Sequence, residues 1–512
     1  MDRRGFLGLA TGAAAGLLVG CGDDDAILGE GETDSSSTGA GPETSRTTGA
    51  STRAATSSTD PDGTGTDPSE DETGDTGDTG EATCEPGGFE TAFDAETLPE
   101  EDEAFPIAIM AGEMKPTSAM VTTWIPDGQP RLLRIWRPGP ADGTVIVAAE
   151  VEVTPNAAGF VKVPVEGLCP GTWYRYAFLR GPVDAFESRS PIAEFRTAIA
   201  DDVLEPLTVT VSSCNGSSLN WPALELVADE YYDMFLHLGD MSYNDGAYSL
   251  PEFRDKWRQF LGASGFRKAY ARAGLYATWD DHEIDDNSRF DRETMDPSEL
   301  QKRQNAMDAY FEVLPIDAEG PDYRLWRSFR WGLTAEIIVL DCRYERRPSQ
   351  GQYMSQEQMD WLKDRLLNSP CHFKVIMNSV PITNMPLAWS VASSDRWEGF
   401  PQSRNELLGF INEHQIDNIW FLAGDFHVSF VSRLEPSVTN HASTIREIAV
   451  TGGNENPVPE SILAMTPPQF AYGTRRARAL LLTFDPQANA VNVRFINPTT
   501  GDDDYNESLT YG

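Results

Sequence analysis

The sequence contains few cysteines, few histidines and only half as many basic as acidic residues. Six cysteines in 512 residues are too few for a disulfide-stapled scaffold. With 40 basic and 80 acidic residues the net charge is −40, which argues against duplex nucleic acid as the main partner. No apolar run near the N-terminus is long enough to span a bilayer. The length and the 40% hydrophobic content indicate two or three globular domains.

Aromatic residues are absent from Gly22 to Gly88, where Ser, Thr, Gly, Asp and Glu predominate. Residues 21–100 contain 21 acidic residues against Arg46 and Arg53, so nearly half of the net negative charge lies in this segment. Such a composition buries too little apolar surface to offset the entropy of ordering the chain. We predict a disordered acidic linker over residues 22–95 that holds the remaining chain away from a membrane.

The first 21 residues have the features of an export signal. Arg3 and Arg4 precede a Gly-Phe-Leu triplet and a short apolar run rich in Ala and Gly, which resembles a twin-arginine signal. The Leu-Val-Gly-Cys sequence that ends at Cys21 resembles a lipobox. An ordinary secretory signal with a chance cysteine is the alternative. Residues 1–21 therefore predict the twin-arginine export machinery as a partner, a lipid anchor at Cys21, and a periplasmic or cell-surface location.

The other five cysteines cannot all form pairs, because their number is odd. Cys214 is our candidate for an unpaired thiol. In an oxidising compartment Cys84 could pair with Cys169, or Cys342 with Cys371, and the sequence does not decide between these pairings.

Short runs of β-branched and aromatic residues recur between about 103 and 198, separated by turns rich in Gly, Pro and Asp. This spacing is typical of a β-sandwich. The stretch from Leu168 to Tyr176 resembles the turn and strand of a fibronectin type III domain. We predict a small fibronectin type III-like β-sandwich over residues 96–200, which carries no catalytic residues.

The pattern changes to alternating strands and helices after Pro206. Apolar runs at 208–212, 234–237, 275–279, 335–340, 373–377 and 419–422 predict strands, with helices between them. Three final strands, at 445–450, 479–484 and 491–496, lack intervening helices, which suggests an antiparallel edge or a second sheet. We predict an α/β sandwich over residues 205–512, with its site at the carboxyl ends of the strands.

Four polar motifs follow these predicted strands directly, so their side chains can converge on one crevice. They are Ser213-Cys214-Asn215-Gly216, Gly239-Asp240-Met241-Ser242-Tyr243, the run from Trp279 to Asn287, and Gly424-Asp425-Phe426-His427.

These motifs contain two different kinds of metal ligand. The Cys214 thiolate, the Tyr243 phenolate and the His427 imidazole suit a transition metal of high charge such as ferric iron. Oxygen donors suited to calcium, magnesium or manganese come from Asp281, Asn287 and Asp425. Asp240 is placed to bridge the two ions. Such an asymmetric pair suits a two-metal hydrolase, in which one ion acidifies water and both clamp phosphoryl oxygens.

Each motif alone has a simpler interpretation. A lone buried cysteine is more often an apolar thiol than a ligand. Tyr243 could be a core residue, His427 a satisfied loop histidine, and the acidic run after Trp279 a solvated loop. All four motifs in this order make coincidence improbable.

The order and residue pattern of the motifs resemble those of the PhoD-like alkaline phosphatase family of metallophosphoesterases. The features shared are Ser-Cys-Asn, Gly-Asp-x-x-Tyr, Trp-Asp-Asp-His-Glu ending in Asn287, and Gly-Asp-x-His. The stretch from Asp395 to Pro401, followed by Arg404, and the preceding β-sandwich extend the resemblance over roughly residues 103–500. It implies hydrolysis of phosphomonoesters, phosphodiesters or both at alkaline pH by metal-activated hydroxide, with Fe(3+) and Ca(2+) as cofactors.

The resemblance also implies roles for individual residues. Iron would be bound by Cys214, Asp240, Tyr243 and His427, and calcium by Asp240, Asn287 and Asp425. Asp281 would either bind metal or orient His282. His282 would contact the phosphate and protonate the leaving oxygen, and Asn215 and Arg404 would contact the substrate.

The sequence departs from the family pattern at two positions, and two alternative functions are open. Asn378 stands where many metallophosphoesterases have a histidine ligand, and Ala111-Gly112-Glu113-Met114 is a loose form of the family's first motif. A purple acid phosphatase would show Asn-His-Glu where this chain has Asp-His-Glu at 281–283, and Gly-His-x-His where it has Gly-Asp-Phe-His at 424–427. A lipid-tethered binding or adhesion protein on a catalytically dead scaffold is the alternative from another class.

Overall fold

The computed structural model describes residues 84, 87–183, 185–286, 291–293, 296–317, 323–385, 389, 394–464 and 467–511. Cys84–Gly512 belong to one compact unit. The predicted signal over 1–21, with Cys21, and the predicted linker up to residue 83 lie outside the described residues. No helix in these described ranges is both long enough and apolar enough to cross a membrane.

A nine-stranded sheet forms the first layer of the α/β sandwich, the fold predicted to be catalytic. In spatial order its strands are β22 (Asp503–Thr510), β21 (Ala490–Ile496), β20 (Ala479–Asp485), β10 (Leu207–Ser212), β11 (Met234–His237), β12 (Gly274–Ala277), β2 (Met110–Lys115), β3 (Ser118–Trp124) and β6 (Phe160–Glu166). The central strands β10, β11 and β12 are parallel, and β20 to β22 form the antiparallel edge predicted for residues 479–496.

A seven-stranded sheet forms the second layer. Its strands, in spatial order, are β13 (Arg327–Trp331), β14 (Ala335–Val339), β15 (Phe373–Met377), β16 (Ile419–Ala423), β18 (Arg446–Ala449), β17 (Ser429–Arg433) and β19 (Phe470–Thr474). Strands β14, β15, β16 and β18 are parallel. The strand predicted at 445–450 therefore lies within this sheet, away from the antiparallel edge formed by β20 to β22.

Alternating side chains show that the two sheets pack face to face. On β11, Met234 and Leu236 belong to the core between the sheets, whereas Phe235 points to the helices outside. On β14, Ile337 lies in the shared core and Ile338 in the outer one. Because successive side chains of a strand point to opposite faces, both sheets are buried on both sides.

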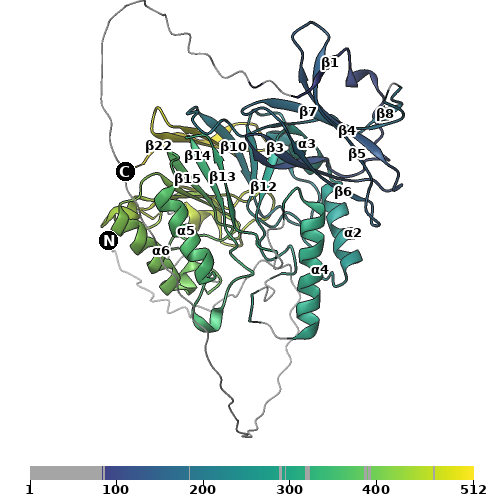
Figure 1. The fold of residues 1–512 in the computed structure, drawn as a ribbon. Coiled ribbons are helices and arrows are strands. Elements are labelled where there is room, and N and C mark those ends of the chain that lie inside the picture. The colour runs from purple at the N-terminus through teal and green to yellow at the C-terminus, as the bar shows by residue number, and fades with distance from the viewer. Residues whose placement is uncertain are drawn as a thin grey trace, which may run out of the picture. The chain divides into compact units, whose positions relative to one another are not determined.

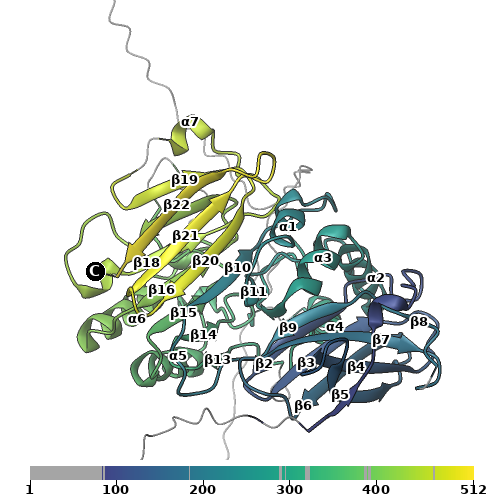
Figure 2. The same cartoon turned by 90° about the horizontal axis from the view of Figure 1, so that it is seen from above.

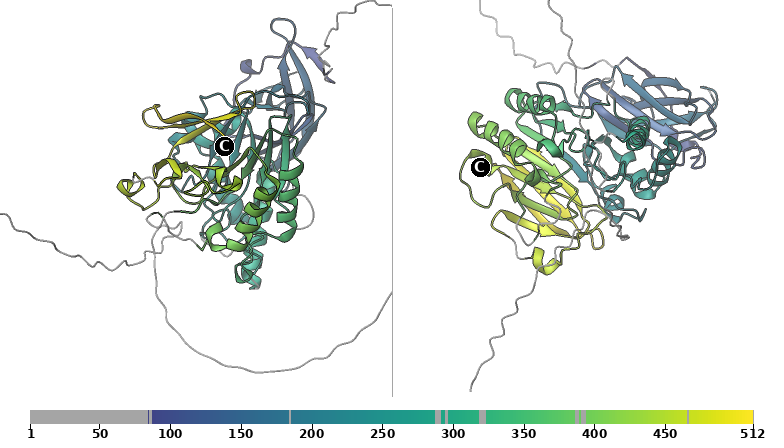
Figure 3. Two further views of the ribbon diagram at one scale, coloured as in Figure 1. Left: turned by 90° about the vertical axis from the view of Figure 1, so that its left-hand side faces the viewer. Right: turned by 90° about the horizontal axis from the view of Figure 1, so that it is seen from below.

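Helices cover the two outer faces, as the views from the side, above and below show (Figures 1, 2 and 3). The nine-stranded sheet is covered by α1 (Pro222–Val227), α2 (Leu250–Leu261), α3 (Ser264–Arg272) and α4 (Pro297–Val313). The seven-stranded sheet is covered by α5 (Gln356–Asn368) and α6 (Pro401–His414). The short elements are α7 (Glu460–Leu463), η1 (Ala95–Thr97), η2 (Pro348–Gln350), η3 (Trp397–Gly399) and η4 (His441–Thr444). The expected α/β sandwich is confirmed.

Helix starts follow local sequence signals. A capping box of Ser249 and Glu252 opens α2, and Ser355 accepts a hydrogen bond from the backbone of Gln358 at the start of α5. These side chains satisfy backbone N–H groups that lack helical partners.

The N-terminal β-sandwich shares one of its sheets with the catalytic fold. Its own six-stranded sheet comprises β1 (Phe89–Thr91), β5 (Val145–Val153), β4 (Arg131–Pro138), β7 (Trp173–Arg180), β8 (Ser188–Arg189) and β9 (Ala193–Arg196). The opposite face is built by β2, β3 and β6, which continue the nine-stranded sheet through the pairing of Gly112 with Leu275. The sandwich is thus joined to the catalytic layers by a continuous sheet.

Two residues of β2 fit this junction specifically. A Cβ atom on Gly112 would lie 2.7 Å from Pro315 and 2.8 Å from the carbonyl oxygen of Leu275, so the close approach requires glycine. The Glu113 carboxylate, buried at the same junction, accepts a hydrogen bond of 2.6 Å from Arg327 of β13. A buried acid in a strand is tolerated because a buried arginine compensates its charge.

Candidate metal centre

Four of the predicted site residues adopt left-handed backbone conformations. The φ angles are 50° at Cys214, 53° at Asp240, 56° at Asp425 and 54° at His427. Cys214, Asp240 and Asp425 follow β10, β11 and β16 within three residues. Non-glycine residues adopt this conformation at an energetic cost, and such strained positions cluster at functional sites. The sharp turns direct the side chains across the carboxyl ends of the strands.

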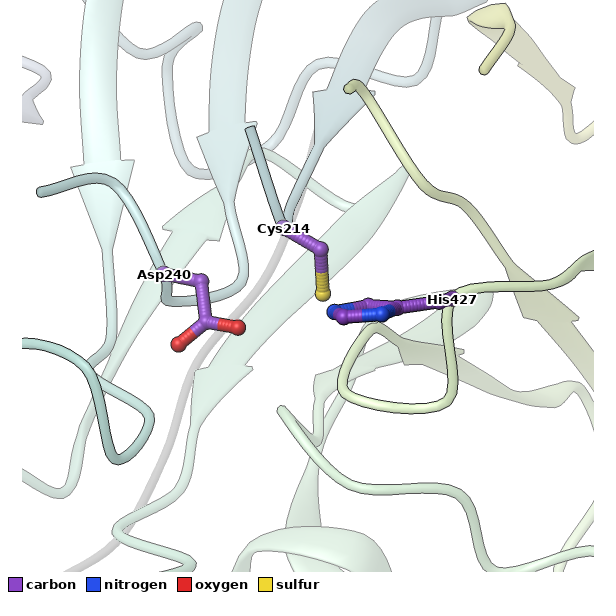
Figure 4. A group of neighbouring side chains, drawn as sticks. All are labelled: Cys214, Asp240 and His427. Atoms are coloured by element: carbon purple, nitrogen blue, oxygen red, sulfur yellow. The ribbon is translucent and has the colours of Figure 1, made fainter. Parts of the chain in front are cut away.

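Cys214, Asp240 and His427 form the first group of converging ligands. Each is buried and offers one ligand atom, and these atoms lie within 4.8 Å of one another. Figure 4 shows the Cys214 sulfur pointing toward the imidazole of His427, with the Asp240 carboxylate beside them. One sulfur, one oxygen and one nitrogen donor at this separation fit a single transition-metal ion.

Two further groups adjoin the first. Asp240, Asp281 and His282 form one, and Asp280, Asp281 and Asp425 form the other, with the same limit of 4.8 Å between ligand atoms. Asp240 belongs to the first two groups and Asp281 to the last two. The donors therefore form a continuous array, sulfur- and nitrogen-containing at one end and all-carboxylate at the other.

The electrostatics of the array favour a bound cation. Burial raises the pKa of Asp240 and of the Cys214 thiol well above their usual ranges, and burial raises that of Asp425 to about 6 although Arg343 opposes the shift. Burial lowers the pKa of His427 to about 4, which keeps its imidazole neutral and able to bind metal. Multivalent cations replace protons on such groups, so this donor set fits a metal.

Tyr243 lies beside the first group. Its hydroxyl is 3.5 Å from a carboxylate oxygen of Asp240, and its ring stacks on His282 at a centroid distance of 3.9 Å. The phenolic oxygen is thus close to the carboxylate that two ligand groups share.

His282 is held by a carboxylate outside the array. Its Nδ1 atom lies 2.8 Å from Asp245, and its buried Nε2 atom makes no hydrogen bond within the described part of the chain. Burial alone would lower the pKa of His282, but the carboxylates of Asp240, Asp281 and Asp245 together raise it well above its usual value. Asp245 therefore orients the ring, and the neighbouring carboxylates favour its protonated form.

Arg343 lies among the carboxylates, and the sequence did not predict it. It is buried and forms ion pairs with Asp280, Asp425 and, at 2.6 Å, Asp395. The residue comes four positions after the end of β14, so the rule that located the four motifs could also have located this one. Its guanidinium supplies positive charge at the all-carboxylate end.

The family model of the PhoD-like phosphatases matches residues 209–479, more than half of the chain. The chain belongs to the PhoD-like phosphatase family. Alkaline phosphatase D of Bacillus subtilis (strain 168) is 26% identical in an alignment of 337 residues, and the match covers 57% of this chain and 57% of that protein. The match thus spans little more than half the length of this curated relative.

Solved structures show the same fold. A structure of PhoD matches with a TM-score of 0.67 and 21% identity, over 80% of this chain and 89% of the other. A purple acid phosphatase from yellow lupin (Lupinus luteus) seeds matches with a TM-score of 0.57 and 12% identity, over 79% and 75%. At these identities the two structural matches show the fold alone. The family model is the finding that favours the PhoD-like phosphatases over the purple acid phosphatase alternative.

The two predicted substrate contacts have internal partners. The amide of Asn215 is buried and contacts His237 at 2.8 Å and Ser212 at 3.1 Å. Arg404 of α6 donates to the carbonyl oxygen of Ile382 at 2.9 Å and pairs with Glu435 at 2.8 Å. The assignment of Asn215 and Arg404 to the substrate stays a prediction, whereas Arg343 contacts the ligand array directly.

Two further residues of the sequence-based interpretation are Asn287 and Asn378. Asn287 lies outside the described residues. The side chain of Asn378 accepts a hydrogen bond of 3.0 Å from Trp397 and donates one of 2.6 Å to the carbonyl oxygen of Val380. Both partners hold Asn378 in the turn that follows β15.

The cysteine pairing left open by the sequence is resolved. Cys84 and Cys169 form a disulfide, whereas Cys342 and Cys371 are buried free thiols. Cys214 is also a free thiol, as predicted.

A segment missed at the sequence level links the ligand loops. Backbone N–H groups of Gly452 and Gly453 donate to the carbonyl oxygens of Ser213 and Cys214 at 2.7 and 3.1 Å, and that of Asn456 donates to His427 at 3.0 Å. A Gly-Gly pair directly after a buried strand was the available signal. This segment therefore connects the Cys214 loop to the His427 loop through backbone hydrogen bonds.

Proposed function

We propose that this chain hydrolyses phosphomonoesters, phosphodiesters or both at a two-metal centre. The observation that carries the proposal is the position of Asp240, which belongs to the group with Cys214 and His427 and, together with Asp281, to a second group that adjoins the carboxylates of Asp280 and Asp425. A carboxylate shared between two such groups is suited to bridge two ions. Bound ions would acidify a water molecule and neutralise the phosphoryl oxygens.

The donor chemistry supports iron at one end and calcium at the other. Cys214, Asp240, Tyr243 and His427 would hold Fe(3+), because thiolate and phenolate favour a transition metal of high charge. Asp240 and Asp425, with Asn287, would hold Ca(2+) through oxygen donors. Asp281 belongs to the two groups that lack Cys214 and would either bind metal or orient His282.

His282 would act as the general acid. Asp245 holds its Nδ1 atom, so the Nε2 atom is the one left to give a proton to the leaving ester oxygen. Arg343 would offset the charge of Asp280 and Asp425 and so keep the carboxylates ionised around the substrate.

The test is Asp240→Asn, assayed on 4-nitrophenyl phosphate and bis(4-nitrophenyl) phosphate together with metal analysis of the purified protein. We expect loss of metal and of both activities. Asp233→Asn is the matched control, because Asp233 is a buried aspartate directly before the same strand, at its opposite end, where it bonds to Thr208 and Arg196. Wild-type rates in Asp240→Asn would exclude the proposed centre, and an inactive wild type would support a binding protein.

Iron has a separate test. Phenolate bound to ferric iron gives a visible absorption band, so the natively produced protein should be coloured and Tyr243→Phe should lose that colour. A colourless wild type with full activity would exclude iron but leave the hydrolase proposal intact.

We also propose export by the twin-arginine route and a lipid anchor at Cys21, with the enzyme in the periplasm or at the cell surface. The disulfide of Cys84 and Cys169 supports this, because disulfides persist in oxidising compartments. Lysine in place of Arg3 and Arg4 should retain the protein in the cytoplasm, and Cys21→Ser should abolish incorporation of labelled fatty acid. Export of the lysine variant at the wild-type level would contradict the twin-arginine assignment.

A further inference from the structure

Asn454 touches the phenolic oxygen of Tyr243 from the segment that links the ligand loops. Its Nδ2 atom lies 2.7 Å from that oxygen. The backbone N–H of Asn454 donates to the carbonyl oxygen of Cys214 at 2.9 Å. One residue therefore contacts Tyr243 through its side chain and the Cys214 loop through its backbone.

The amide and the proposed metal would approach the phenolic oxygen without competing. The Tyr243 hydroxyl donates toward Asp240, at 3.5 Å, and accepts from Asn454. A cation shared with Asp240 would replace the proton of Tyr243, whereas the hydrogen bond from Asn454 would remain. Since a phenolate oxygen can only accept, the NH₂ end of the amide must face it.

The Cys214 loop leaves room for this amide. A Cβ atom on Gly216 would lie 2.2 Å from the Oδ1 atom of Asn454, so glycine at that position leaves the space that the amide fills. Gly216 itself has a φ of 76°, which favours glycine independently. The amide is thus packed against the Cys214 loop.

We propose that Asn454 is a positioning residue that donates a hydrogen bond to the metal-ligating oxygen of Tyr243. The inference rests on the proposed iron site. In this role the hydrogen bond from Asn454 orients the Tyr243 ring and reduces electron donation from the phenolate to iron. A hydrogen bond to an ionised oxygen stabilises its lone pairs, so more energy is needed to transfer an electron from phenolate to iron. Partners of metal ligands generally orient those ligands and tune the metal in this way.

The test compares the visible absorption band of the wild-type protein with that of Asn454→Leu, which has a similar volume and no donor. We expect the band to move to longer wavelength, the iron reduction potential to fall, and iron affinity to decrease by about 10- to 100-fold. Asn454→Asp keeps the shape of the side chain and serves as a second variant if the leucine protein does not fold. It should lose iron more severely, because a carboxylate would face the phenolate.

Asn456→Leu is the matched control. Asn456 lies in the same segment, but its side chain bonds to the carbonyl oxygen of Phe426 at 2.7 Å and to the N–H of Val458 at 2.8 Å. Its loss should loosen the segment while the band stays at the wild-type wavelength. An unshifted band in both Asn454 variants, or an equal shift in Asn456→Leu, would overturn the inference alone. A wild type that hydrolyses esters without a visible band would overturn it and leave the hydrolase proposal standing.

Discussion

The Nδ1 atom of His282 lies 2.8 Å from one carboxylate oxygen of Asp245 and 3.0 Å from the other. Asp245 comes five residues after Asp240, on the loop that follows β11, and is not a member of any ligand group. The two loops that carry the proposed bridging ligand and the proposed general acid are therefore fixed to each other by this contact.

Replacing Asp245 by Asn should reduce kcat by about 10- to 100-fold, because a partner that orients the histidine and stabilises its protonated form is lost. The loss should be larger for phenyl phosphate than for 4-nitrophenyl phosphate, since a poor leaving group depends more on protonation. Asp285→Asn is the control, because Asp285 lies on the same acidic run but pairs with Lys302. Equal losses on both substrates would contradict the role of His282 as an acid.

Replacing Arg343 by Gln should lower the free energy of unfolding by about 3 to 5 kcal/mol, because it leaves buried carboxylates without their counter-charge. Added calcium should recover part of this loss, since a cation that binds only the folded protein stabilises it. The measurement is urea unfolding with and without calcium. Arg346→Gln, which removes an arginine that pairs with Asp395, is the control. An equal calcium effect in both variants would exclude the proposed role of Arg343.

Two glycines should respond to alanine in opposite directions. A Cβ atom on Gly453 would lie 1.8 Å from the backbone oxygen of Asn215, so Gly453→Ala must displace the Cys214 loop and should reduce both stability and metal content. Gly409 lies in α6 with no atom within 4 Å of its added Cβ, and Gly409→Ala should stabilise the protein by about 0.5 to 1 kcal/mol. Thermal unfolding and metal analysis of both variants test this contrast.

Lys162 should make the protein more stable as the pH rises above 8. Its ammonium group is buried in β6, where it donates to the carbonyl oxygens of Phe311 and Ile316, and burial lowers its pKa from 10.5 to about 8. At pH values between these two pKa values, Lys162 is protonated in the unfolded chain but not in the folded protein. Its contribution to stability therefore increases with pH, by roughly 3 kcal/mol in total.

Urea unfolding of the wild type and of Lys162→Met between about pH 7.5 and 10.5 isolates this contribution. This range covers the pH values over which the contribution should change. The variant should lack the increase, whereas Lys268→Met, at an exposed lysine paired with Glu225, should retain it. Identical slopes in wild type and Lys162→Met would exclude the effect.

The predicted ligands that lie together in the structure share one property: each is on a loop that directly follows a buried parallel strand. Local pattern and the rule for strand ends were sufficient to bring Cys214, Asp240 and His427 together. Arg343 satisfied the same rule but was missed, because a single arginine after a strand has many structural uses.

Other features depended on contacts far apart in the sequence. The sequence around Asn454 does not indicate that its side chain contacts Tyr243, which lies 211 residues earlier. The strand β2 was not predicted, because its Gly112 and Glu113 suit a strand only through contacts with Leu275 and Arg327. Asn215 and Arg404 were assigned to the substrate from resemblance, and their buried partners could not be seen in the pattern.

The pairing of β10 with β20 has a consequence for how this protein is made. Residues 207–211 pair with residues 480–484, and Gly112 of the sandwich pairs with Leu275. During synthesis the N-terminal half leaves the ribosome long before these partners exist, so the nine-stranded sheet keeps open edges until the last strands emerge. Such long-range pairing makes folding slow and leaves strands exposed to aggregation in the meantime. Completion of the sheet is therefore a late event that requires almost the whole chain, and the Cys214 turn after β10 cannot be fully supported before then.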